Sequence, residues 1–158
     1  MSYGSGNFDG EEWRDTVTLA PGLVITDQSI RVANYSSGFA GVDGILGVRH
    51  VALTKGTVNN TGTVPTVLDN LFTQGMISEK VLGVYFAPAS VSGTGELTFG
   101  GYDTSLISSS LHHVSPTTTH PASYYWGIEE SIKYGKAPSC RQLRELSTLA
   151  PPDSHRHR

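Results

Sequence analysis

The chain has 158 residues, of which 16% are charged, and its net charge is −3 at pH 7. This length suffices to bury one hydrophobic core, and the slight acidity excludes a surface that attracts nucleic acid or anionic lipid. The 18 glycines and many Ser and Thr residues are typical of an all-β protein with tight turns.

A single cysteine, Cys140, limits covalent and metal chemistry. One cysteine cannot form an intramolecular disulfide or a cysteine-based metal site. Because no apolar run approaches about 20 residues, we expect no transmembrane helix. The first residues lack a basic patch followed by an apolar stretch, so we expect no signal peptide in this chain. We therefore expect no cofactor, no metal and no membrane partner.

The first part of the chain predicts strands. Residues 13–19 alternate between two faces, which is the pattern of a strand. Shorter strands are predicted at residues 23–25 and 30–32, separated by the polar residues 26–28. Residues 44–48 form a short apolar run flanked by glycines, as a buried strand would be.

One helix is predicted over residues 65–74. Pro65 suits the first helical turn, and Gly75 suits the position just past the end. The apolar residues of this stretch are spaced to form one stripe along the helix, and they are Val67, Leu68, Leu71 and Phe72.

After the helix the pattern returns to strands. Residues 81–87 and 96–99 predict a hairpin that turns at residues 92–95. Residues 124–134 alternate again and predict a further strand.

The composition changes at Lys136. Residues 136–158 are basic and end in two prolines and a His/Arg run. Three leucines there could line a short helix, but the composition favours a disordered tail. The two histidines lack cysteine or carboxylate partners and make a poor metal site. We therefore divide the chain into a domain at 1–135 and an unrelated tail at 136–158.

Two motifs carry a resemblance to a known family. Tyr3-Gly4-Ser5-Gly6 is followed, about forty residues on, by Val42-Asp43-Gly44-Ile45-Leu46-Gly47. In this order and at this distance they resemble the flap tip and the next core strand of the pepsin-like aspartic proteases, peptidase family A1. Residues 66–76, 96–103 and 124–128 follow the family's order. The Ser/Thr-rich strands and the lack of disulfides are similar to those of its secreted fungal members.

The resemblance implies a partial pepsin-like acid protease fold. It would be all-β with one clear short helix, comprising the second half of the N-terminal lobe and the start of the C-terminal lobe. The implied activity is that of a secreted aspartic endopeptidase acting on polypeptide substrates. The resemblance implies no cofactor, and a monomer for a full-length relative.

The resemblance also implies substrate-binding roles for the flap residues Tyr3, Gly4 and Ser5. Glycine permits close approach of two backbones, a hydroxyl can bond the substrate backbone, and an aromatic ring excludes water. Without the later motif, these residues would read as an ordinary hairpin turn.

Three further residues would border the substrate by resemblance. Val42 and Ile45 would face the non-primed pockets, and Tyr125 would border the primed side. Each has a plain alternative, since apolar and aromatic residues in a strand often serve only the core. The resemblance makes Asp43 a structural residue.

The catalytic chemistry of the family is missing from the sequence. It needs two carboxylates that share a proton, and the family supplies them in two Asp-Thr/Ser-Gly triplets. None of the seven aspartates here begins such a triplet, and Asp103-Thr104-Ser105 comes nearest. We expect both catalytic aspartates to lie outside this chain, a partial or mis-spliced product that is inactive alone.

Two other functions remain open. A non-catalytic remnant of the protease fold could still bind peptides, and composition alone would allow a lectin-like β-sandwich. The ordered motifs argue against the sandwich. Asn34 and Asn59 begin Asn-x-Ser/Thr sequons and are candidates for glycosylation.

Overall fold

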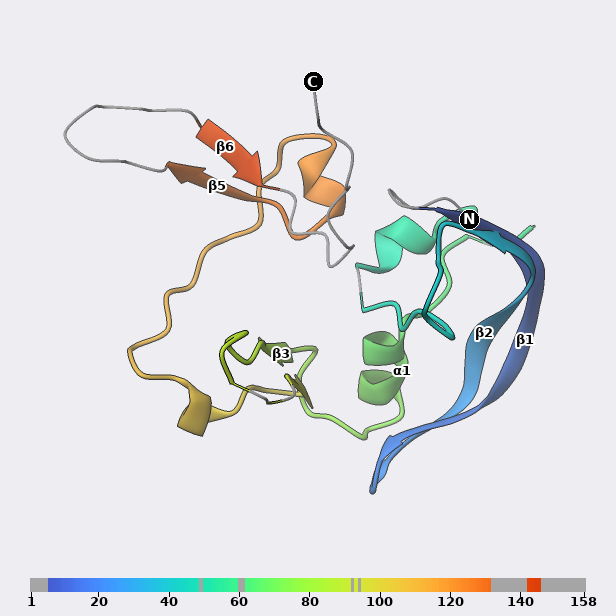
Figure 1. Cartoon of the computed structure of the whole chain (residues 1–158), viewed down its shortest axis with the longest axis horizontal. Coiled ribbons are helices and arrows are strands. Elements are labelled where there is room, and N and C mark those ends of the chain that lie inside the picture. Colours follow the sequence, from blue (N-terminus) through green and yellow to red (C-terminus); the bar gives the residue numbers. More distant parts are fainter. Residues whose placement is uncertain are drawn as a thin grey trace. The chain divides into compact units, whose positions relative to one another are not determined.

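The computed structural model describes residues 6–48, 50–59, 62–91, 93, 95–131 and 142–145 (Figure 1). These residues are mostly strand with one short α-helix, which confirms the predicted fold class. In chain order the elements are β1 (Asn7–Ala20), β2 (Leu23–Ser37), η1 (Val51–Thr54), α1 (Val67–Thr73), β3 (Leu82–Tyr85), β4 (Glu96–Phe99), η2 (Thr104–Leu106), η3 (Ala122–Tyr124), β5 (Ile128–Ser131) and β6 (Gln142–Glu145), where η marks a 3-10 helix.

The chain divides into two compact units. The first unit comprises residues 1–12, 31–64 and 113–158, and the second comprises residues 13–30 and 65–112. In the described residues, the strands form three two-stranded sheets, β1–β2, β3–β4 and β5–β6. The β1–β2 hairpin contributes residues to both units, because the boundaries fall inside its strands.

The second strand of this hairpin is longer than its sequence predicts. The short strands expected at 23–25 and 30–32 are one continuous strand, β2, so the predicted interruption at residues 26–28 was wrong. Asp27 adopts a left-handed backbone with φ 56°, a conformation that Asp tolerates better than most residues. The polar side chains here also have partners on α1, described below, so they do not end the strand.

The core of the second unit forms where α1 packs on β2 (Figure 1). Ile25 and Leu71 are fully buried. Of the predicted helix stripe, Val67, Leu68 and Leu71 are buried, while Phe72 is 42% exposed. The remaining members of the core are Ile77 together with the partly buried Leu19, Leu23 and Phe99.

Both ends of α1 follow from local sequence. Thr66 is the N-cap, and its hydroxyl accepts from the Asp69 backbone while the Asp69 carboxylate accepts from the Thr66 N–H, which completes a capping box. Pro65 therefore precedes the cap instead of lying in the first turn. Gly75 adopts φ 72° just after the helix, as predicted.

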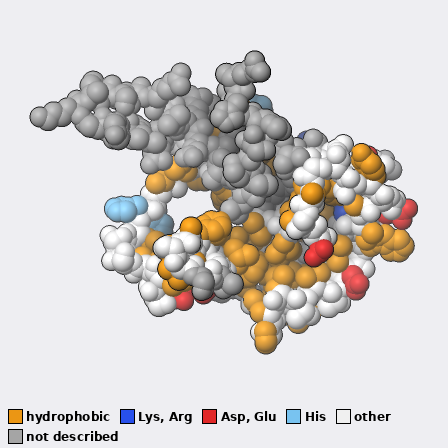
Figure 2. Space-filling model, viewed as in Figure 1, with side chains coloured by type: hydrophobic (Ala, Val, Ile, Leu, Met, Phe, Trp, Pro, Cys, Tyr) orange, Lys and Arg blue, Asp and Glu red, His pale blue; other side chains and the backbone are white. Residues whose placement is uncertain are grey.

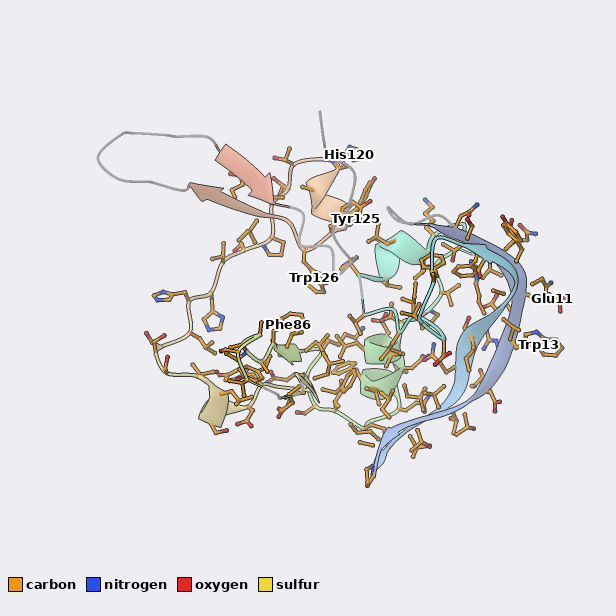
Figure 3. The ribbon with its side chains drawn as sticks, in the orientation of Figure 1. Glu11, Trp13, Phe86, His120, Tyr125 and Trp126 are labelled. Atoms are coloured by element: carbon orange, nitrogen blue, oxygen red, sulfur yellow. The ribbon has the colours of Figure 1, made fainter. Side chains whose placement is uncertain are left out.

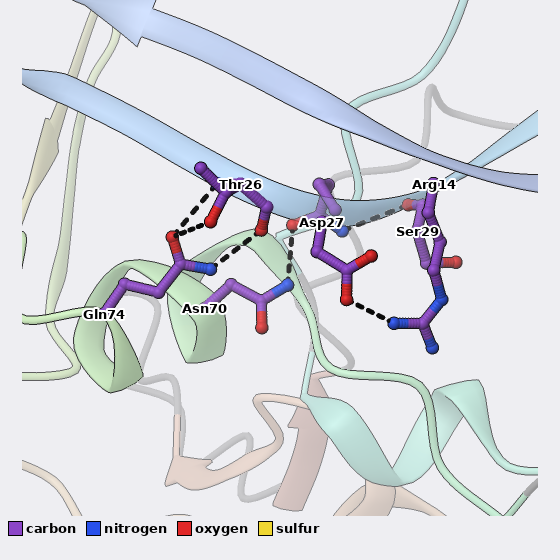
Figure 4. Close-up of polar contacts among 7 residues, drawn as sticks. Arg14, Thr26, Asp27, Ser29, Asn70 and Gln74 are labelled. Atoms are coloured by element: carbon purple, nitrogen blue, oxygen red, sulfur yellow. Dashed lines mark hydrogen bonds and ion pairs between the residues drawn. The ribbon is translucent and has the colours of Figure 1, made fainter.

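The polar face of α1 is tied to β2 through an amide clamp, formed by Thr26, Gln28, Asn70 and Gln74 (Figure 4). Gln74 Oε1 accepts from the Thr26 N–H at 3.0 Å, and Gln74 Nε2 donates to the Thr26 carbonyl at 2.9 Å. Asn70 Nδ2 donates to the buried Gln28 Oε1 at 2.9 Å. The Asn70 bond satisfies the Gln28 amide, which burial would otherwise penalise. The neighbouring Arg14–Asp27 ion pair is exposed and contributes little to stability.

The predicted hairpin after the helix is present as β3 and β4. The strands pair antiparallel, with Leu82 opposite Phe99 and Tyr85 opposite Glu96. A side-chain carbon at Gly83 would lie 2.9 Å from the Gly101 carbonyl oxygen, so glycine is required where the two backbones meet. The predicted turn at 92–95 lies partly outside the described residues.

Two strand predictions in the first unit were wrong. Residues 44–48 form no regular element, because the described residues include no strand that pairs with them. The strand expected from residue 124 begins only at Ile128, since residues 122–124 form η3. In the predicted tail, β6 pairs with β5 where the leucine spacing had allowed a short helix. In the described residues, no helix reaches the length and apolar character needed to cross a bilayer.

We expect Leu71→Ala to lower the free energy of unfolding by about 2–5 kcal/mol, because Leu71 is fully buried between α1 and β2. Its neighbour Phe72, partly exposed beneath Lys80 Nζ at 5.4 Å from the ring centroid, provides the matched control. Phe72→Ala should cost about 1 kcal/mol or less. Urea denaturation followed by circular dichroism measures both values, and equal losses would contradict this packing.

We expect Asp69→Asn to lower the free energy of unfolding at pH 6 by about 1 kcal/mol, as loss of a helix cap does. Partial burial acts to raise the pKa of Asp69, but hydrogen bonds and charge from Lys80 and hydrogen bonds from Thr66 hold it below its ordinary value of 3.8. The folded pKa is thus depressed, so this stabilisation is present above pH 3.8 and is lost as the pH falls through the folded pKa.

The pH dependence separates this cap from a general loss of stability. The difference between the unmodified chain and Asp69→Asn should shrink as the pH falls from 6 toward 2, because protonation of Asp69 removes the same interactions. Urea titrations at several pH values measure this difference. A difference that stays constant over this range would show that the charge of Asp69 contributes nothing.

Candidate functional site

The predicted flap residues Tyr3, Gly4 and Ser5 lie outside the described residues, so their role stays a prediction. The described chain begins at Gly6, where β1 starts and β2 ends. A side-chain carbon at Gly6 would collide with the Ser37 carbonyl oxygen, so the two backbones approach closely here. Gly6 therefore lies at the end of the hairpin opposite its Pro21-Gly22 turn.

The motif around Val42 and Ile45 is an exposed, irregular segment. Val42 is 58% and Ile45 is 52% exposed, and Gly41 before them adopts φ 84°. The buried strand predicted over 44–48 is thus absent, and in this chain neither side chain serves a core. Figure 2 shows hydrophobic side chains open to solvent on the face in view. Their contact with a substrate stays a prediction.

The aspartate nearest to a catalytic triplet has a structural role. Asp103 Oδ1 accepts from the Ser105 N–H at 2.7 Å and caps η2. Hydrogen bonds from the Ser105 side chain and backbone hold the pKa of Asp103 below its ordinary value. Asp43 is exposed within the irregular segment.

Tyr125 and Trp126 lie next to one another on the stretch that leads into β5 (Figure 3). Tyr125 is half-buried, and its N–H donates to the Ala122 carbonyl at 3.0 Å, which closes η3. A side-chain carbon at Gly127 would lie 2.8 Å from that same carbonyl oxygen, so the backbone folds tightly just after the pair. This tight backbone fold fixes the position of the Tyr125 backbone.

A threonine–glutamate network supports this stretch, and sequence reasoning missed it. Buried Thr117 donates its N–H to the Gly127 carbonyl at 2.8 Å and its hydroxyl to Glu129 Oε1 at 3.0 Å. The Thr119 hydroxyl donates to the same oxygen at 3.4 Å. The only sequence signal was a run of threonines ahead of a carboxylate in an alternating stretch.

His50 connects the Tyr125–Trp126 stretch to the turn that follows the Val42–Gly47 motif. Its imidazole lies edge-on to Trp126, with ring centroids 6.2 Å apart and an interplanar angle of 81°. Its Nδ1 accepts from the Ala52 N–H at 3.2 Å and caps η1. Both contacts lie within the first unit, so His50 links two stretches that carry predicted substrate residues.

In the described part of the chain, no group of three or more His, Cys, Asp or Glu residues is arranged to hold a metal ion.

Comparison with known proteins identifies the protein family to which the chain belongs. Residues 1–145 match the family described as "Eukaryotic aspartyl protease". The chain therefore belongs to the pepsin-like aspartyl protease family, and the match extends past the boundary predicted at residue 135.

Individual relatives refine the class. The chain is 52% identical to Polyporopepsin of Irpex lacteus over 143 residues, covering 88% of this chain and 42% of that protein. It is 39% identical to Rhizopuspepsin-1 of Rhizopus niveus, covering 85% and 34%. The crystal structure of aspartic proteinase from Irpex lacteus matches with a TM-score of 0.82 and 50% identity, over 87% of this chain and 42% of that one. The chain spans less than half the length of these relatives.

Proposed function

We propose that this chain forms part of an aspartic endopeptidase that hydrolyses polypeptides in acid. The family membership and the 52% identity to Polyporopepsin support the proposal. The chain has no Asp-Thr/Ser-Gly triplet of its own, so the two carboxylates must come from outside these 158 residues. Alone, the chain would contribute substrate contacts without the hydrolytic step.

The proposed substrate contacts come from three places in the sequence. Tyr3, Gly4 and Ser5 would cover an extended peptide, and Val42 and Ile45 would contact its apolar side chains. Tyr125 would border the primed side of the bound peptide. The exposure of Val42 and Ile45 supports this role, because both apolar side chains are free to be covered by a ligand.

A second candidate is a peptide-binding remnant without catalysis. The absence of both triplets together with the exposed apolar segment favours it for this chain taken alone. Tyr125→Ala tests it, because a remnant that binds peptides should lose affinity when the aromatic border is removed.

The assay for hydrolysis compares two polypeptides. We expect the 158-residue chain to release no fragments from a labelled denatured protein between pH 2.5 and 7. A longer product of the same gene with an Asp-Thr/Ser-Gly triplet on each side should cleave it in acid. Changing either triplet aspartate to Asn should abolish cleavage. Hydrolysis by the 158-residue chain alone would overturn our assignment of the catalytic groups.

We also propose that the protein is secreted, and that its full-length form is monomeric. Asn34 and Asn59 are both exposed, and Ser36 of the first sequon is exposed as well. Exposure of the acceptor is required for N-glycosylation.

Expression through a fungal secretory pathway tests the two sequons. We expect intact mass spectrometry to show added glycan that N-glycosidase removes. Asn34→Gln and Asn59→Gln should each remove one glycan, and the double variant should have the mass of the bare chain. Unglycosylated protein from the secretory pathway would contradict the assignment, with Asn7→Gln, at an exposed asparagine that lies in no sequon, as the unchanged control.

A further inference from the structure

We propose that Thr117 and Glu129 are positioning residues that fix Tyr125 in the place where it binds peptide. The inference rests on the proposed function, because it takes from there the role of Tyr125 at the border of the substrate. Its basis in the structure is the loop of residues 117–129, which hydrogen bonds close and in which Tyr125 lies between two fixed points of the backbone.

The first fixed point lies just before Tyr125, in η3. The Tyr125 N–H donates to the carbonyl of buried Ala122 at 3.0 Å. The Ser123 N–H donates to the Thr119 carbonyl at 2.9 Å. These two bonds tie the chain on the N-terminal side of Tyr125 to the beginning of the loop.

The second fixed point is Gly127, two residues after Tyr125. Its carbonyl accepts from the Thr117 N–H at 2.8 Å, and the residue is buried. A side-chain carbon at Gly127 would lie 2.8 Å from the Ala122 carbonyl oxygen and 2.9 Å from the Ala122 side chain. Gly127 thus packs against the same residue that accepts from Tyr125, so the Tyr125 backbone cannot shift unless one of these two neighbours moves.

The Thr117 side chain joins the beginning of the loop to its end. Its hydroxyl donates to Glu129 Oε1 at 3.0 Å and accepts from the Thr119 N–H at 3.1 Å, which uses both the donor and the acceptor capacity of a hydroxyl. Thr117 is buried, and hydrogen bonds to a carboxylate are stronger than those between neutral groups. The longer bond from the Thr119 hydroxyl, at 3.4 Å, reaches the same oxygen.

The clamp acts on the loop that precedes β5, because β5 itself is held by another element. It pairs antiparallel with β6, with Ile128 opposite Glu145. Tyr125 is half-buried (Figure 3), so part of its side chain stays accessible to a ligand while its backbone is fixed. An aromatic side chain that is already in place loses less freedom when a peptide binds to it. Thr117 and Glu129 would act through Tyr125 and would not touch the substrate.

Nuclear magnetic resonance of the 158-residue chain tests the clamp without any substrate. Thr117→Val removes the hydroxyl and keeps the branched shape and the backbone N–H. We expect hydrogen exchange of the Tyr125 amide to become faster by roughly tenfold, because the loop opens more often once its ends are no longer joined. The Tyr125 ring signals should shift as well. Thr117→Ser keeps the hydroxyl and should keep both values of the unmodified chain.

A threonine–glutamate pair elsewhere in the chain provides the matched control. The Thr98 hydroxyl donates to Glu96 Oε1 at 2.7 Å on β4. Thr98→Val removes a bond of the same chemistry and should leave the Tyr125 signals unchanged.

Variants of Glu129, whose side chain is exposed, give a second test that does not depend on the folding of Thr117→Val. Glu129→Leu removes the acceptor and should reproduce the effect of Thr117→Val on Tyr125, whereas Glu129→Gln keeps an acceptor oxygen and should not. Thr117→Val/Glu129→Leu should have no larger effect than the larger of the two single variants, because both remove the same bond. Fully additive effects would show that the two residues act separately and would overturn the proposal.

Kinetics of the longer product that carries both triplets test the meaning of the clamp for the substrate. We expect Thr117→Val to raise KM by roughly three- to tenfold and to change kcat by less than about twofold, because Tyr125 would bind the peptide without taking part in the chemical step. Thr117→Ser should return KM to its original value, and Thr98→Val should not change it. A merely structural loss would instead reduce the active fraction, which lowers kcat and leaves KM unchanged.

The outcomes separate this proposal from the proposed function. Tyr125 signals that stay unchanged in both Thr117→Val and Glu129→Leu would overturn it, whatever the activity. Signals that change while KM does not would overturn it as well, because the position of Tyr125 would then not matter to the substrate. A longer product that cleaves no polypeptide would contradict the proposed function, and the resonance measurements would still decide whether the clamp fixes Tyr125.

Discussion

The packing of α1 against β2 is the constraint on which the second unit depends. Leu71 and Ile25 exclude water from the contact, which provides the driving force, but apolar packing alone does not fix how far the helix slides along the strand. The amide clamp adds directional hydrogen bonds from Gln74 to Thr26 and from Asn70 to Gln28, which hold the helix at the observed register. Asp27 in the same stretch adopts a left-handed backbone within the continuous strand β2.

The sequence predicted those elements whose signals are local. The helix was found because Pro65, Gly75 and the apolar stripe all lie within one short stretch. The strand predicted at residues 44–48 is absent from the structure, because an apolar run becomes a strand only when a partner pairs with it. The division of β2 was an error of the same kind, since partners on α1, more than forty residues away, offset the polarity of residues 26–28.

The candidate site, like the fold, was predicted from the sequence only in part. The motifs of residues 3–6 and 42–47, together with the segments that follow in order as far as residues 124–128, were sufficient to predict the family, which the comparisons then showed. The contacts that hold these motifs were not predictable. His50 with Trp126, and Thr117 with Glu129, join residues distant in sequence, and neither pair belongs to a periodic pattern. Asp103 shows the opposite case, because a suggestive sequence neighbourhood proved to be a helix cap.

The interleaved composition of the two units has a consequence for synthesis on the ribosome. All residues of the second unit have been made once the chain reaches residue 112, whereas the first unit needs residues from both the beginning and the end. Its contacts close long loops, which is slow and entropically costly. During translation the half of the hairpin formed by residues 6–12 and 31–37 therefore waits for residues 113–131 before its unit is complete. The second unit can therefore complete its own contacts earlier in synthesis than the first.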